Sequence, residues 1–112
     1  MGSVIRGNDD FDSKKAFTQN QSWEDVTSSR AINQPYTNNT DKAISVAINL
    51  RHDASSNLIL KIKVDGSPII SSDINSFSAG AQLPFSVIVP AGSSYEVDTT
   101  QSLIVISWFE LR

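Results

Sequence analysis

Leu103-Ile104-Val105-Ile106-Ser107-Trp108-Phe109-Glu110-Leu111-Arg112 is the stretch that decides the fold, because it is the most β-prone run in the chain. It consists mainly of β-branched and aromatic residues and contains neither Gly nor Pro. Read with a period of two, one face carries Leu103, Val105, Phe109 and Leu111, and the other carries Ile104, Ile106 and Trp108. A strand that is apolar on both faces is predicted to lie in the middle of a sandwich, or to place one face on the core and the other on a second subunit.

Short strands and turns alternate upstream of this run. The clearest strand is residues 43–51, where every second position is apolar, and residues 58–64 repeat the pattern. Asp65-Gly66 predicts a tight hairpin. Further strands are expected at residues 22–27, 68–71, 85–89 and 95–98, with polar connections at residues 28–42 and 73–83.

No segment spaces its apolar residues as a helix would over three turns. The sequence therefore predicts an all-β fold, an antiparallel sandwich of about seven or eight short strands, either jelly-roll or immunoglobulin-like. The strand order stays open at this stage.

The chain of 112 residues has the length of one domain and a net charge of −3. It has no basic run of the kind that binds nucleic acid, and no apolar run near the ~20 residues that a membrane helix needs. It also lacks cysteine, which excludes disulfides. We expect residues 1–21 to be a flexible extension or a linker, opened by an expression-vector remnant at Met1-Gly2-Ser3, and residues 22–112 to be the domain.

The residues that carry chemistry are few and scattered. The single histidine, His52, has only Asp53 beside it, which is neither a metal site nor a catalytic triad. Asp9, Asp10 and Asp12 lack the glycine and distal glutamate of a calcium loop, so a solvated acidic turn is the expectation. Trp23 and Trp108 suit either a sugar-stacking platform or, for Trp108, the core or an interface. The sequence predicts no enzyme, no catalytic or metal-binding residue and no cofactor.

Four motifs, in this order, resemble the C-terminal domains of tailed-phage and prophage tail-fibre or tail-tip proteins. They are Trp23-Glu24-Asp25-Val26-Thr27-Ser28-Ser29-Arg30, Tyr36-Thr37-Asn38-Asn39-Thr40, Val89-Pro90-Ala91-Gly92-Ser93-Ser94-Tyr95 and Trp108-Phe109-Glu110-Leu111-Arg112. The resemblance implies a trimeric β-sandwich head on a fibre of the virion tail, joined to other tail proteins. It implies that the head binds a polysaccharide or outer-membrane receptor on the bacterial surface. It also implies scaffold roles for Arg30, Tyr36 and the Trp108 strand.

Two sets of site residues follow as hypotheses. If the second face of the terminal strand packs on neighbouring copies, the trimer interface contains Ile104, Ile106 and Trp108. If residues 1–21 lead from a shaft and consecutive strands are antiparallel, the connections at residues 28–42, 65–67 and 91–94 lie at the far end. The Asn-rich first connection then predicts receptor contacts at Tyr36, Asn38 and Asn39.

Two other functions stay open. A carbohydrate-binding module attached to an enzyme would be a monomer with exposed aromatic residues in a row. A virion decoration protein or structural jelly-roll protein would be trimeric and would have no affinity for bacterial envelopes.

Overall fold

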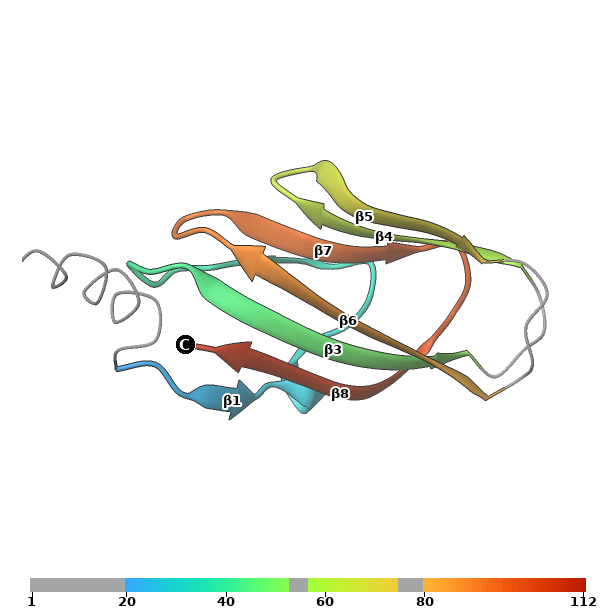
Figure 1. Cartoon of the computed structure of the whole chain (residues 1–112), viewed down its shortest axis with the longest axis horizontal. Coiled ribbons are helices and arrows are strands. Elements are labelled where there is room, and N and C mark those ends of the chain that lie inside the picture. The colour runs from blue at the N-terminus through green and yellow to red at the C-terminus, as the bar shows by residue number, and fades with distance from the viewer. Residues whose placement is uncertain (1–19, 53–56, 75–79) are drawn as a thin grey trace, which may run out of the picture.

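The computed structural model describes residues 20–52, 57–74 and 80–112, which form two antiparallel four-stranded sheets (Figure 1). One sheet has the order β1-β8-β3-β6, with bounds Trp23–Asp25, Ile104–Leu111, Ile44–His52 and Ala81–Val89. The other has the order β2-β7-β4-β5, with bounds Pro35–Thr37, Ser94–Thr99, Leu58–Val64 and Ser67–Ile74. A single 3-10 turn, η1 at Thr27–Ser29, is the one helical element of the described residues. The predicted all-β sandwich is confirmed.

The strand order is that of a jelly roll. Strand β1 pairs with β8, β2 with β7, β3 with β6 and β4 with β5, so the chain is paired as one long nested hairpin. Successive pairs fall alternately in the two sheets, and the contacts of β3 with β8 and of β4 with β7 complete each sheet. An immunoglobulin-like sandwich distributes its strands differently.

Strand β3 shows why the chain folds in this way. Its residues alternate strictly between buried and half-buried from Ile44 to His52, which is the pattern of a strand with one face on a core. Strand β4 from the opposite sheet alternates in the same way over Leu58–Ile62. Among the residues that the structure describes, twelve buried hydrophobic ones lie between the sheets: Ile44, Val46, Ile48, Leu50, Leu58, Leu60, Ile62, Val87, Val89, Tyr95, Val97 and Trp108.

A β-bulge in the terminal strand changes which residues point inward. Leu50 of β3 lies opposite Val105, but its neighbour Asn49 lies opposite Ser107, so Ile106 is an extra residue in β8. After the bulge the alternation changes parity, and Trp108 points into the core on the same side as Val105. The prediction that Trp108 shares an outer face with Ile104 and Ile106 is therefore wrong, because Trp108 is 0% exposed.

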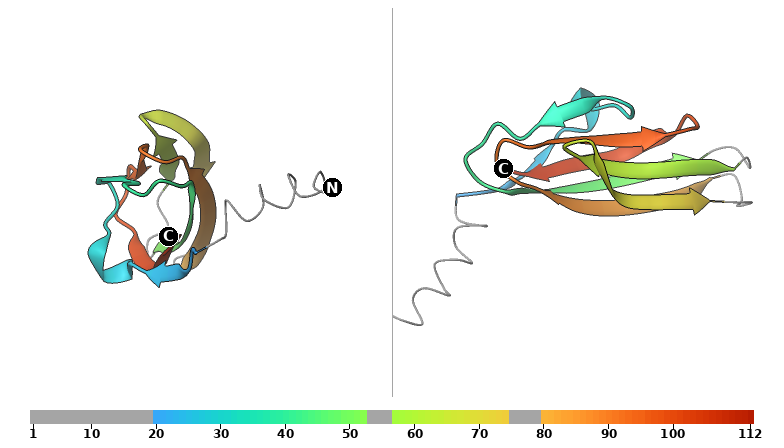
Figure 2. Two further views of the ribbon diagram at one scale, coloured as in Figure 1. Left: turned by 90° about the vertical axis from the view of Figure 1, so that its left-hand side faces the viewer. Right: turned by 90° about the horizontal axis from the view of Figure 1, so that it is seen from above.

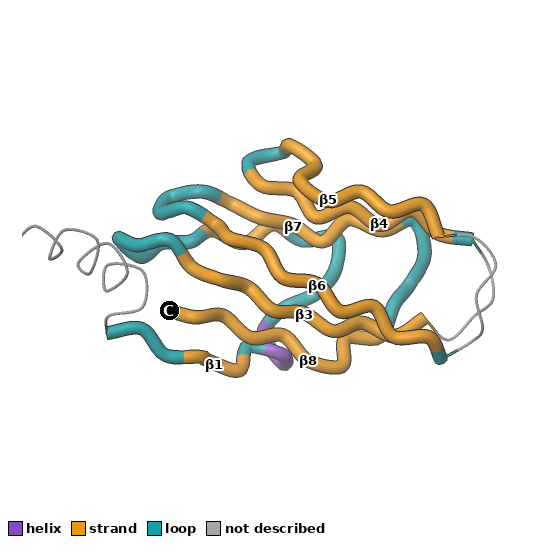
Figure 3. The backbone as a smooth tube through the Cα atoms, viewed as in Figure 1, coloured by secondary structure: helices purple, strands orange, loops and turns teal. Residues whose placement is uncertain are grey.

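Loops and turns gather at the two ends of the sandwich (Figure 3). Hydrogen bonds tie several of them together at one end, where Asn38 N–H donates to Ser93 O (2.8 Å) and Asp65 N–H donates to Ser94 O (2.8 Å). The chain enters at this same end, because Arg112 N–H donates to Ser22 O (3.0 Å). Residues 65–67 and 91–94 lie at the same end of the sandwich as Ser22, so the expectation that they lie at the end far from the start of the domain is wrong (Figures 1 and 2). The connection predicted at residues 28–42 contains strand β2. This additional strand reverses the chain once more than expected, so the turns that follow lie at the opposite end from the predicted one.

The hairpin at Asp65-Gly66 is confirmed. Both residues have positive φ (51° and 83°), as a type I′ turn requires, and Val64 pairs with Ser67 across it. The two prolines that lie within longer strands, Pro68 and Pro84, occupy β5 and β6. Both are edge strands, where a residue without an N–H group is tolerated.

Candidate functional site

The outer face of the β1-β8-β3-β6 sheet holds most of the exposed large hydrophobic residues on the described part of the chain. Four of its six exposed large hydrophobic residues lie there, namely Trp23, Ile88, Ile104 and Ile106. One row of outward residues crosses the whole sheet in register: Trp23, Leu111, Ser45 and Ile88. The next row crosses it as Asp25, Phe109, Ala47 and Ser86. Isolated apolar residues are ordinary on a surface, but a contiguous set of them marks an interaction site.

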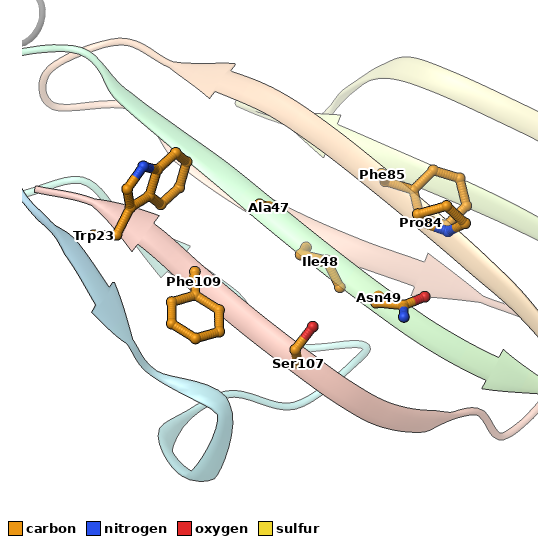
Figure 4. A pocket seen from close by; sticks show the side chains of 8 residues that line it. All are labelled: Trp23, Ala47, Ile48, Asn49, Pro84, Phe85, Ser107 and Phe109. Carbon is orange, nitrogen blue, oxygen red and sulfur yellow. The ribbon is translucent and has the colours of Figure 1, made fainter.

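A hollow runs along β3 on this face, and we call it the β3 trough. Small residues of β3 form its floor, while larger residues of the neighbouring strands form its walls (Figure 4). Its volume is about 460 Å³, and its lining includes Trp23, Ala47, Asn49, Pro84, Ser107 and Phe109. The trough exists because β3 places short side chains outward at Ser45, Ala47 and Asn49, while its inward positions carry the core residues.

The outer face of the other sheet is different. It carries Lys61, Lys63, Glu96 and Asp98, and Lys63 Nζ lies 2.9 Å from Asp98 Oδ2 in an exposed ion pair. The face with the trough carries one basic residue, Arg51, and its acidic residue Asp25 lies on the edge strand β1. The two faces therefore differ in charge as well as in hydrophobicity, which is expected if one meets water and the other a partner.

Glu110 is a buried carboxylate behind the apolar face, 1% exposed. The guanidinium of Arg30 donates to both of its oxygens, from Nε at 3.0 Å and from Nη2 at 3.1 Å. Arg112 Nη1 adds a bond of 2.9 Å, and the Tyr95 hydroxyl donates to Glu110 Oε2. Burial, followed by the hydrogen bond to Glu110, raises the pKa of Tyr95 well above its usual value. The phenol therefore stays protonated and remains a hydrogen-bond donor to Glu110.

Tyr36 belongs to the same network, which bears on its predicted receptor contact. Its ring lies edge-on to Trp108 at 6.0 Å between centroids, and Arg30 Cζ lies 4.6 Å from the ring centroid. Its hydroxyl accepts the Ala31 N–H at 2.8 Å. Arg30 and Tyr36 thus stabilise the segment that connects the two sheets. The half-buried Tyr36 ring packs against Trp108 and Arg30.

The structure separates the two asparagines that the sequence groups together. Asn38 is 0% exposed, and its Nδ2 donates to the backbone oxygens of Lys42, Val89 and Pro90 at 2.8, 3.0 and 3.1 Å. Its role in receptor contact is therefore ruled out by burial. Asn39 is exposed and accepts a hydrogen bond of 2.8 Å from Arg112 Nη2. Of the three predicted contacts, Asn39 is exposed, Tyr36 is half-buried and Asn38 is buried.

The remaining sequence hypotheses have these outcomes. His52 is the buried last residue of β3 and does not lie in a turn. In the described ranges no three His, Cys, Asp or Glu residues converge as metal ligands would, and the acidic cluster at residues 9–12 lies outside those ranges. No helix in the part of the chain that the structure describes is long and apolar enough to cross a membrane.

Comparison with protein-family models, with curated proteins and with solved structures finds no match for this chain.

The trough was not predicted from the sequence. The alternating pattern of β3 marks its inward core residues and does not show that its short outward residues form a hollow. The available signal was the outward series Ser45, Ala47 and Asn49 between two strands with large outward residues. That signal depends on knowing that β8 and β6 flank β3.

Proposed function

We propose that this chain is the head domain of a phage tail fibre or tail tip, a non-enzymatic module that recognises the host cell surface and caps the fibre as an oligomer. The observation that carries the proposal is the apolar, nearly uncharged outer face of the β1-β8-β3-β6 sheet. A head that ends a multi-chain fibre needs such a face for its neighbouring copies. The four motifs that resemble tail-fibre domains support the same function.

The position of Ser22 beside Arg112 directs receptor recognition to the opposite end of the sandwich. Ser22 accepts a hydrogen bond from the Arg112 N–H, and Gln21 Nε2 donates to Ala43 O. The β6–β7 turn lies at this same end, since Arg112 contacts Asn39 and Asn38 N–H donates to Ser93 O, so a shaft attached before Asn20 would cover that end. Strands β3, β5 and β7 end at the other one (Figure 1). Of its described residues, Thr100, Gln101 and Ser102 are exposed and polar, which suits hydrogen bonding to sugar hydroxyls.

Adsorption to bacteria tests this proposal. The fluorescently labelled chain is incubated with a panel of intact bacteria and with purified lipopolysaccharide, and bound protein is measured after washing. We expect saturable binding to at least one strain. A four-residue Gly-Ser insertion after Gln101 should abolish it, whereas the same insertion after Ala91, at the end near the termini, should not. Absence of binding across the panel, or equal effects of both insertions, would contradict the proposal.

A specific observation makes a carbohydrate-binding module the second candidate. The indole of Trp23 is 52% exposed at the rim of the β3 trough, with Asn49 and Ser107 inside it. An exposed aromatic ring beside polar groups is the arrangement that stacks on a sugar. A polysaccharide that binds a monomeric chain and changes its tryptophan emission would favour this function.

A further inference from the structure

The β3 trough contains a hydrogen-bond acceptor without a donor. Asn49 lines the trough, and its Oδ1 is buried and has no hydrogen-bond partner among the described residues, whereas its Nδ2 donates to Gln82 Oε1 at 3.1 Å. A buried acceptor without a donor costs free energy, and few such atoms remain unpaired in native structures. An occupant of the trough should therefore supply an apolar group for the floor at Ala47 and a donor for Asn49.

The described part of the chain begins beside the trough. Asn20 is its first residue and has a positive φ of 61°, a conformation found mainly in turns. Three residues later, Trp23 forms part of the trough wall. A segment that turns at Asn20 can thus pass from the edge strand β1 onto the outer face of the sheet.

We propose that residues 9–15 of the same chain cover this face, with the ring of Phe11 in the β3 trough. Their sequence is Asp9-Asp10-Phe11-Asp12-Ser13-Lys14-Lys15, and they lie outside the described ranges. Such a contact goes beyond the proposed function. It leaves three exposed isoleucines of the same face accessible to neighbouring copies, because Ile88, Ile104 and Ile106 do not line the trough.

Reach selects Phe11 from the two phenylalanines that precede Asn20. The far end of the trough at Asn49 lies about seven residue steps along the strands and about two strand spacings across from Asn20, a straight distance of about 25 Å. Phe17 is three residues from Asn20 and spans at most about 10 Å, whereas Phe11 is nine residues away and spans about 30 Å. Phe11 therefore reaches the trough, and a backbone N–H of its segment supplies the donor that Asn49 lacks.

The charges of the face and of the segment fall in complementary order. Asp25 lies on β1, the strand at which the chain enters, and Arg51 lies on β3 beyond the trough. In the segment, Lys14-Lys15 lies between Phe11 and the entry, and Asp9-Asp10 lies on the other side of Phe11. With Phe11 in the trough, the lysines lie towards Asp25 and these two aspartates lie towards Arg51, so opposite charges meet on both sides.

Introduced cysteines can trap the contact, because the chain has none of its own. Phe11→Cys combined with Ala47→Cys should form a disulfide within one chain under mild oxidation, since this bond needs Cα atoms within about 7 Å of each other. Val4→Cys combined with Ala47→Cys is the matched control, because Val4 is farther from Asn20 along the chain and can also reach the trough. Denaturing gels and mass spectrometry of the digested protein separate disulfides within a chain from disulfides between chains.

Quenching of tryptophan fluorescence by acrylamide tests the same contact without cysteines. Trp23 is 52% exposed beside the trough and Trp108 is 0% exposed, so the quenching reports on Trp23. We expect Phe11→Ser to increase the quenching, because it uncovers Trp23, and Val4→Ser to leave it unchanged. Circular dichroism verifies that both variants keep their β structure.

The outcomes decide between occupants of the trough. Trapping of the Phe11→Cys pair within one chain, above the level of the Val4→Cys pair, together with increased quenching in Phe11→Ser, would support the inference. Equal trapping of the two pairs, or unchanged quenching in Phe11→Ser, would overturn it. Disulfides between chains would show that a neighbouring copy fills the trough, and a polysaccharide that reduces Trp23 quenching in the wild type would show that a sugar fills it. Each of these results would overturn the inference as well.

Discussion

Arg30 holds the buried carboxylate of Glu110 through two hydrogen bonds, of 3.0 and 3.1 Å, across a sequence separation of 80 residues. The pair joins the connection after β1 to the end of β8. It also lies under the ring of Tyr36, which covers the guanidinium. This ion pair therefore connects the segment that follows β1 to β8, the last strand.

Replacing Arg30 by Ala should lower the free energy of unfolding by about 3 kcal/mol, because it leaves a buried carboxylate with less of its charge compensated. Urea unfolding followed by the fluorescence of the buried Trp108 measures the change. Lys63→Ala is the matched control, since the Lys63–Asp98 pair lies on the surface, where water screens the attraction between the charges. Equal losses in the two variants would show that the Arg30 pair is no stronger than a surface pair.

Asn38→Ala should destabilise the chain by about 2 kcal/mol or more, because three backbone oxygens each lose a hydrogen bond from this buried side chain. Asn39→Ala should change stability by less than about 0.5 kcal/mol, because its one bond to Arg112 is exposed. Thermal unfolding of the two variants side by side provides the measurement. An Asn38→Ala variant with the stability of the wild type would mean that the turn between β2 and β3 does not depend on the Asn38 side chain.

Deletion of Ile106 should be tolerated, with a loss of no more than about 1 kcal/mol. Removing the extra residue of the bulge leaves Val105, Ser107 and Trp108 facing as they do now. Deletion of Phe109 should instead cost about 4 kcal/mol or more, because Glu110 would turn outward, away from Arg30. Circular dichroism and urea unfolding compare the two deletions. An unfolded chain after deletion of Ile106 would contradict this description of the bulge.

The fold was predictable where the sequence pattern is local. Strand β3 alternates over nine residues, and Asp65-Gly66 has the residues that a two-residue hairpin needs. Strand β2 was missed because Pro35, Tyr36 and Thr37 are too few to show a period and are defined only by their pairing with β7. The jelly-roll order was not predictable either, because it depends on pairings between distant segments.

The candidate site was harder to predict than the fold. The bulge at Ile106 reverses which residues of β8 point inward, and it is visible only in the pairing of β8 with β3. A strict alternation along β8 therefore predicts the wrong face for Trp108. From the sequence, Asn38 is predicted to be an ordinary turn residue. Its buried role could not be predicted, because its three acceptors are backbone oxygens and two of them belong to the distant residues Val89 and Pro90. Exposure of Ile104 and Ile106 is consistent with their assignment to an outer face, and their place in an interface stays a prediction.

The neighbouring positions of Ser22 and Arg112 have a practical consequence for protein engineering. Joining these ends through a brief glycine-rich bridge and reopening the polypeptide elsewhere should yield circular permutants with the same architecture. For the same reason residues 22–112 can be inserted as a domain into a surface loop of an unrelated protein, to which two adjacent connecting segments would join them.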